Sequence, residues 1–267
     1  MKADEVEFLA ELVRLRCGQR VERDRTYVIE TRLAPVARRE GFGSIREMLL
    51  AVRQRADERL GWAVVEAMAA GETYFFRDRT PFRRLREDLL PKLTQARGGR
   101  PLRVWSAGCA TGQETYSLAM LLHEAGGARA ELIGSDISAQ GLQRAQAGVY
   151  TQFEVQRGLP IRMLLEHFER REEMWAASAA LRAAVTWKRV NLIADFSALG
   201  SIDVIFCRNV VGSMDEAARR RVLEQMSRML PRDGVLVLGR EEAPAGEAFS
   251  PLGDGLFGVN PAVRAAA

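Results

Sequence analysis

The sequence predicts an α/β protein in which a short all-helical region precedes a larger sheet domain. Apolar residues recur at helical spacing through residues 4–70, and from residue 102 onward short apolar runs alternate with amphipathic stretches. Strands that alternate with helices are typical of a parallel sheet whose connections cross over through helices. The expected strands span 102–106, 131–135, 185–190, 203–208 and 234–239, and the expected helices span 113–125, 138–147 and 215–230.

The front of the chain is expected to be helical from residue 4 to Gly71. Ser44 ends the helix breaker GFGS and is followed three residues later by Glu47, which is the pattern of an N-terminal capping box. A further helix is expected over 81–95. Residues 150–184 are polar and poorly periodic, and the chain ends in a tail rich in glycine and proline with short apolar pieces.

The composition is that of a globular protein with one large or two modest domains. Of 267 residues, 47% are apolar, which suffices for a core, and 28% are charged. No apolar run approaches the roughly 20 residues that cross a bilayer. The N-terminus is an acidic amphipathic helix and lacks the basic start of a signal peptide. We therefore expect a cytoplasmic protein without membrane insertion.

Cysteine and histidine usage argues against several kinds of site. Cys17, Cys109 and Cys207 are odd in number and widely spaced, which fits a reduced cytosol and neither a disulfide framework nor a zinc site. His123 and His167 lie far apart in the sequence, which argues against a Ser-His-Asp triad or a histidine metal cage. We expect no metal, and any chemistry must use Arg, Asp, Glu, Asn or hydroxyl groups.

The positive charge is concentrated in the front of the chain. Residues 1–100 carry 21 Lys/Arg against 16 Asp/Glu, whereas residues 101–267 carry 18 against 19. This asymmetry indicates either a solvated arginine-rich surface or a docking surface for an acidic protein. Nucleic acid is the least favoured partner because no basic run is interleaved with aromatic residues.

The loop after the first strand indicates a ligand that is not a polyphosphate. Gly108 and Gly112 allow close approach of the backbone, but the segment has no phosphate-loop lysine, and Glu114 would repel phosphate at the helix N-terminus. Asp136 ends the second strand, where it can accept hydrogen bonds from two ribose hydroxyls. S-adenosylmethionine, a nucleoside with a cationic amino acid tail, is such a ligand. Alternatively, Glu114 is a first-turn acid favoured by the helix dipole and Asp136 caps a helix.

Three further segments stand in the order and at about the spacings of one known family. They are TYFFRD at 73–78, WSAGCATGQETYSLAM at 105–120 and IFCRNVV at 205–211. With SDIS, AQAGVY, RVNL and LPRDGVLVLG, they resemble the CheR-type chemotaxis receptor methyltransferases, which are protein-glutamate O-methyltransferases. The resemblance covers nearly the whole chain.

The resemblance implies a particular domain arrangement and set of cofactor contacts. A helical domain over 1–72 would precede a Rossmann-like S-adenosylmethionine-binding domain over 73–267, with a small β-subdomain inserted within about 150–185. Thr73 and Arg77 would approach the methionine end of the cofactor and the reaction centre, and Glu114 would hold its ammonium group. The other implied cofactor contacts are Gly71, Gly108, Asp136 at the ribose, Asn191 and Leu192 at the adenine, and Asn209 with Val210.

The implied reaction is transfer of a methyl group to a glutamate side chain in the cytoplasmic helical domain of a chemoreceptor, releasing S-adenosylhomocysteine. A carboxylate is already an anionic nucleophile at neutral pH, so catalysis consists mostly of positioning. Arg77 is the candidate for gripping that carboxylate, because its planar fork matches the two oxygens. We expect a monomer, since nothing in the sequence demands more.

The substrate side departs from the family pattern. Ser213 stands where members usually have a tyrosine that orients the substrate, so we take Ser213 as the second catalytic position. GREE at 239–242 replaces the usual GHSE, and Gly71 replaces an asparagine. The 150–185 region is compact, which argues against docking of a receptor tail peptide. These changes leave three interpretations: the chemoreceptor enzyme, a cofactor-binding signalling module with little or no transfer, or a methyltransferase for another substrate.

Overall fold

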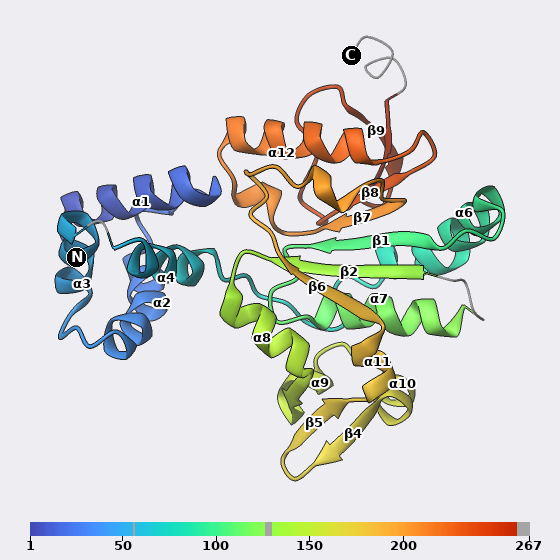
Figure 1. The fold of residues 1–267 in the computed structure, drawn as a ribbon, viewed down its shortest axis with the longest axis horizontal. Coiled ribbons are helices and arrows are strands. Elements are labelled where there is room, and N and C mark those ends of the chain that lie inside the picture. Colours follow the sequence, from blue (N-terminus) through green and yellow to red (C-terminus); the bar gives the residue numbers. More distant parts are fainter. Residues whose placement is uncertain (56, 126–129, 261–267) are drawn as a thin grey trace.

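The computed structural model describes residues 1–55, 57–125 and 130–260. The helical front consists of α1 (Ala3–Cys17), α2 (Thr26–Arg39), α3 (Ile45–Arg55) and α4 (Glu58–Ala69), which enclose their own apolar core around Leu9, Leu33 and Val64 (Figure 1). Ser44 caps α3 by accepting from the backbone N–H of Glu47 at 3.1 Å. The capping box is only half formed, since the Glu47 carboxylate accepts from Gly43 N and not from Ser44 N.

The main sheet has seven strands in the order β6-β2-β1-β7-β8-β10-β9. Its strands are β1 (Leu102–Ala107), β2 (Ala130–Asp136), β6 (Val185–Arg189), β7 (Val204–Cys207), β8 (Val235–Leu238), β9 (Phe249–Gly253) and β10 (Leu256–Val259). The pairs among β6, β2, β1, β7 and β8 are parallel, as predicted, but β10 pairs antiparallel with both β8 and β9. The hairpin of β9 and β10 lies in the C-terminal tail, for which no strand was predicted.

Helices cover both faces of the sheet, so the strands bury side chains on both faces, as β1 illustrates. The Val104 side chain packs into the core beneath α7 (Gln113–Glu124), whereas Trp105 packs into the core beneath α12 (Glu216–Met229). Successive side chains of a strand point to opposite faces, so a strand buried on both faces reads as a continuous apolar run. Figure 1 shows α12 above the sheet and α7 with α8 (Ala139–Ala147) below it.

The expected helix over 81–95 is interrupted. It forms α5 (Thr80–Arg84), a π-helical turn (Leu85–Leu89) and α6 (Leu90–Arg97), with the Leu90 N–H donating to the Leu85 carbonyl five residues back. Pro91 accounts for the interruption, because it has no N–H and its ring crowds the carbonyl four residues earlier.

A second, three-stranded antiparallel sheet extends from the main domain (Figure 1). It is formed by β3 (Val149–Thr151), β5 (Met174–Ala177) and β4 (Phe168–Arg171), in that spatial order. Short helices α9 (Gln152–Gln156), α10 (Ile161–His167) and α11 (Ala179–Ala183) surround it. The predicted fold class, an α/β domain with a small inserted sheet preceded by helices, is confirmed. Within the described residues, no helix has both the length and the apolar character to span a membrane.

Candidate cofactor and substrate site

A cavity lies at the carboxyl ends of β1, β2 and β7, where the helical front meets the sheet domain. Its volume is about 600 Å³, including space that opens to solvent. We call it the strand-end cavity; its lining includes Gln19, Gly108, Asp136, Asn191, Arg208 and Val210. This is the edge where open α/β sheets bind ligands.

Gly108 brings the backbone to the cavity wall. Its φ of +76° favours glycine, and a Cβ built there would lie 2.4 Å from the Val210 Cγ2 atom. The loop is held to β2, because the Gly108 and Cys109 N–H groups both donate to the Ser135 carbonyl at 2.8 and 2.9 Å. A larger residue at position 108 would therefore both strain the loop and displace Val210.

Asp136 ends β2 and fixes the loops on either side of it. Its two oxygens accept from Ala110 N at 2.8 Å and Ser138 N at 2.9 Å. Burial raises the pKa of Asp136 above its ordinary value, while these backbone donors act in the opposite direction. A carboxylate oxygen can accept more than one hydrogen bond, so Asp136 retains acceptor capacity for ligand hydroxyls. The helix cap itself is Ser138, whose hydroxyl accepts from Gly141 N.

Glu114 belongs to a buried ionic chain beneath the cavity. It accepts from Ser106 Oγ at 2.9 Å and from Arg208 Nη1 at 3.2 Å, and Arg208 Nη2 donates to Asp78 at 2.7 Å. Burial raises the pKa of the Glu114 carboxyl, and Arg208 counteracts that shift. Arg208 is only 5% exposed, lines the cavity, and has an Nε–H without a hydrogen-bond partner among the described residues.

The helical front supplies one wall of the cavity. Asn191 donates from its amide to the Arg16 carbonyl at 2.7 Å, and Gln19 forms a β-bridge with Met214. On the α4 side, Glu66 accepts from Ala139 N at 2.9 Å. These contacts join the helical front to the sheet domain directly around the ligand space.

The segment 209–213 closes the cavity beside β7 and is held by one carboxylate. Glu242 accepts from the backbone N–H groups of Asn209 at 2.7 Å, Gly212 at 2.7 Å and Gly239 at 2.8 Å. Asn209 has a left-handed φ of +59°, which asparagine tolerates better than most residues. Glu242 therefore determines the path of a cavity wall without itself lining the cavity.

A second space adjoins the cavity and shares Gln19, Gly71, Glu72 and Asn209 with it. We call it the arginine groove, because Arg20, Arg25, Arg32 and Arg77 line it together with Ser213.

The two acids of the arginine groove are paired. Glu22 pairs with Arg25 at 2.7 Å, and Glu72 pairs with Arg157, which lies outside the groove. Among the described residues, the other three arginines form no ion pair. Arg20 donates to the Gly212 carbonyl, Arg32 to the Met68 carbonyl and Arg77 to the Glu72 carbonyl. The groove therefore presents three guanidinium groups without a carboxylate partner, next to the strand-end cavity.

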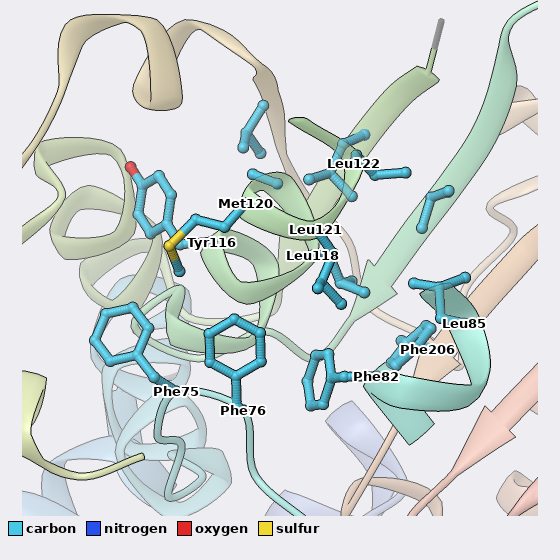
Figure 2. Close-up of a cluster of buried hydrophobic side chains, with 14 of the residues drawn as sticks. Phe75, Phe76, Phe82, Leu85, Tyr116, Leu118, Met120, Leu121, Leu122 and Phe206 are labelled. Atoms are coloured by element: carbon cyan, nitrogen blue, oxygen red, sulfur yellow. The ribbon is translucent and has the colours of Figure 1, made fainter. Parts of the chain in front are cut away.

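Arg77 is presented by a loop anchored in the core. The preceding Phe75 and Phe76 are buried, and Figure 2 shows them beside Tyr116 and Met120 of α7. The Phe76 N–H donates to Ser117 Oγ at 2.9 Å. The two buried rings thus fix the backbone, and the next residue, Arg77, extends its side chain into the arginine groove. Its guanidinium also lies over the Tyr74 ring, 5.4 Å from the centroid.

The predicted site residues are brought together, with two exceptions. Arg77 and Ser213 line the arginine groove. Thr73 and Glu114 line neither space in the part of the chain that the structure describes, so Glu114 faces Arg208 and not the open cavity. The predicted residues that line the strand-end cavity are Gly71, Gly108, Asp136, Asn191, Leu192, Asn209 and Val210.

Sequence reasoning missed Gln19, Arg20, Arg208 and Glu242. For Arg208, a signal was present: an arginine directly after the buried strand VIFC requires a partner. Glu242 was visible only as part of the GREE departure, and its three backbone contacts depend on tertiary structure.

The site fits S-adenosylmethionine on three observations. Asp136 offers carboxylate oxygens to ribose hydroxyls, and the glycine at 108 admits a ligand close to the backbone. Arg208 places a guanidinium group in the cavity wall, and its partner Glu114 lies behind that wall. No lysine or phosphate-binding loop is present for a polyphosphate at this strand end.

Comparison with known proteins gives the same assignment. A family model described as the CheR methyltransferase, SAM binding domain, matches residues 71–249. Chemotaxis protein methyltransferase 1 of Pseudomonas aeruginosa is 34% identical over 236 residues, which cover 85% of each chain. Chemotaxis protein methyltransferase 1 of Vibrio cholerae is 33% identical over 237 residues, covering 86% of each chain. The chain therefore belongs to the CheR methyltransferase family and is an S-adenosylmethionine-dependent methyltransferase.

Proposed function

We propose that this enzyme forms methyl esters on glutamate side chains in the cytoplasmic helical domain of a chemoreceptor. The observation that carries the proposal is the arginine groove: three arginines that have no carboxylate partner among the described residues adjoin the cavity where the cofactor would bind. Glutamate carboxylates on an acidic helical substrate complement these charges. The relatives named above are chemotaxis methyltransferases, which supports the same substrate class.

The chain's contribution to catalysis is positioning. When bound, S-adenosylmethionine supplies a methyl group on a sulfonium, which is already activated for transfer. The substrate carboxylate is ionised at neutral pH, so no general base is needed. Arg77, which lines the groove, grips this carboxylate, and Asp136 and Arg208 in the wall of the adjoining cavity would hold the cofactor.

The partner proposal extends to how the substrate docks. The basic front of the chain faces the acidic receptor surface, and the enzyme acts as a cytoplasmic monomer. We propose docking without a receptor tail peptide. The β4–β5 hairpin is short, with its turn at Glu172–Glu173, and arginines are exposed along β4.

The alternative of an inactive cofactor-binding module is not favoured, because the matched relatives are methyltransferases over most of their length. We propose that the enzyme is active with Ser213 at the tyrosine position, and the presence of Arg77 in the same groove supports this.

The test is transfer of labelled methyl groups to receptor-containing membranes. The protein is incubated with membranes of its own cell and radiolabelled S-adenosylmethionine, and methanol released by alkali is counted. Base-labile label on a chemoreceptor band supports the proposal. Cofactor binding in calorimetry without any base-labile label on membranes would contradict it and leave only the binding module.

A further inference from the structure

Arg20 is fixed to the far end of the chain by both its backbone and its side chain. Its N–H donates to the Ser213 carbonyl at 2.8 Å, and its Nη2 donates to the Gly212 carbonyl at 3.0 Å, although these residues lie more than 190 positions away. The neighbouring bridge between Gln19 and Met214 and the bond from Asp215 N to the Gly18 carbonyl hold the same stretch. Arg20, which follows the C-cap Gly18 of α1, is thus placed beside the 209–213 wall.

The surroundings of Arg20 leave most of its guanidinium available. It lines the arginine groove together with Arg77, Asn209 and Ser213, and among the described residues it has no carboxylate partner. A guanidinium has five N–H donors, and the Gly212 carbonyl engages one of its nitrogens. The Ser213 hydroxyl, in contrast, donates to the Val210 carbonyl at 2.8 Å.

We propose that Arg20 is a substrate-binding residue that holds the target glutamate carboxylate opposite Arg77. This inference rests on the proposed function and adds to it a second residue that binds the target carboxylate, supplied by the helical front. Two arginines from different parts of the chain would bind the side chain from two sides. That arrangement orients one oxygen toward the methyl group while the other is retained by hydrogen bonds.

The step that Arg20 serves balances without a proton transfer. A carboxylate oxygen attacks the methyl carbon, a C–O bond forms, the C–S bond breaks, and its electron pair remains on sulfur. The products are the methyl ester and S-adenosylhomocysteine. The carboxylate loses its charge in this step, so Arg20 and Arg77 hold the ester less strongly than the acid, which favours product release.

The test compares Arg20→Ala, Arg20→Lys and the control Arg23→Ala in the full chain. Arg23 lies on the same segment, is exposed, and pairs with Glu7 outside the groove. We expect Arg20→Ala to lower kcat/KM for the receptor about tenfold to a hundredfold, while the Kd for S-adenosylmethionine changes less than about twofold. Arg20→Lys should recover only part of the loss, because it keeps the charge and loses the planar fork. Methylguanidine should partly restore Arg20→Ala and leave Arg23→Ala unchanged.

The outcomes separate a substrate contact from a structural one. If Arg20→Ala weakens cofactor binding as much as transfer, Arg20 only holds the 209–213 wall and the inference is overturned. If Arg20→Ala behaves like Arg23→Ala, it is overturned as well. Circular dichroism and the melting temperature of each variant report folding. If the wild-type protein forms no base-labile ester, the proposed function fails first, and that result is distinct from a selective effect at Arg20.

Discussion

Glu242 gives the most exact test of how the cavity wall is held. Glu242→Gln keeps the size of the side chain but replaces one of two acceptor oxygens with an NH₂ group. The carboxylate accepts three backbone N–H groups, from Asn209, Gly212 and Gly239. One bond is lost, and the other two change from charged to neutral acceptors. At ~1.5–3 kcal/mol for a bond to a charged group and ~0.5–1.5 kcal/mol for a neutral one, the sum is about 3.5–6 kcal/mol.

The net loss is smaller than this sum, about 2 kcal/mol, because Asn209 and Gly212 are exposed and water can replace their lost acceptor. About 2 kcal/mol released into the 209–213 segment corresponds to about a thirtyfold loss of cofactor affinity if binding requires the closed wall.

Calorimetry with S-adenosylhomocysteine measures this effect without depending on any protein substrate. The matched control is Glu241→Gln, which removes the same charge one residue earlier from an exposed side chain outside both spaces. We expect the control to bind like the wild type. A Glu242→Gln protein that also binds within about twofold of the wild type would refute the reasoning that Glu242 maintains the cavity.

Three further perturbations follow from the site. Arg77→Ala should lower methyl transfer at least about a hundredfold with only a small change in cofactor Kd, because Arg77 lines the groove; unchanged turnover would rule out its role. Gly108→Ala should weaken cofactor binding and lower the melting temperature more than Gly98→Ala: both have positive φ, but only Gly108 would place its Cβ against Val210, costing ~1–3 kcal/mol more. Ser213→Tyr should not raise transfer, since Arg20 already lies beside that segment; a clear gain in the labelling assay would indicate that the missing ring limits the enzyme.

The elements of the sheet domain were predictable because each carries its own local signal. The strand Leu102–Ala107 is largely buried on both faces, and Ser138 is the N-cap of α8. The apolar pattern and the cap therefore predict the boundaries of these two elements within a residue or two. The C-terminal hairpin was not predicted, because β9 and β10 are short and contain glycine and proline. Their pairing depends on β8, which supplies the edge that β10 joins.

The residues of the candidate site also fall into two groups: those whose place follows from the sequence and those whose place depends on tertiary contacts. Asp136 and Gly108 could be placed at the cavity from their positions at strand ends, because topology alone brings both to that edge of the sheet. The environment of Glu114 could not, because its partner Arg208 is 94 residues away and arrives through the pairing of β7 with β1. Arg20 was also out of reach of sequence reasoning, since its role requires that the helical front be docked against residues 212–213.

The seam between the two parts of the molecule has a consequence for protein engineering. The region that matches the family model begins at residue 71, yet Cys17 and Gln19 line the strand-end cavity and Asn191 is tethered to Arg16. A truncation at that boundary would keep Gly108 and Asp136 but remove the residues of the helical front that line the other side of the strand-end cavity. Shortened versions of this enzyme should therefore retain α1.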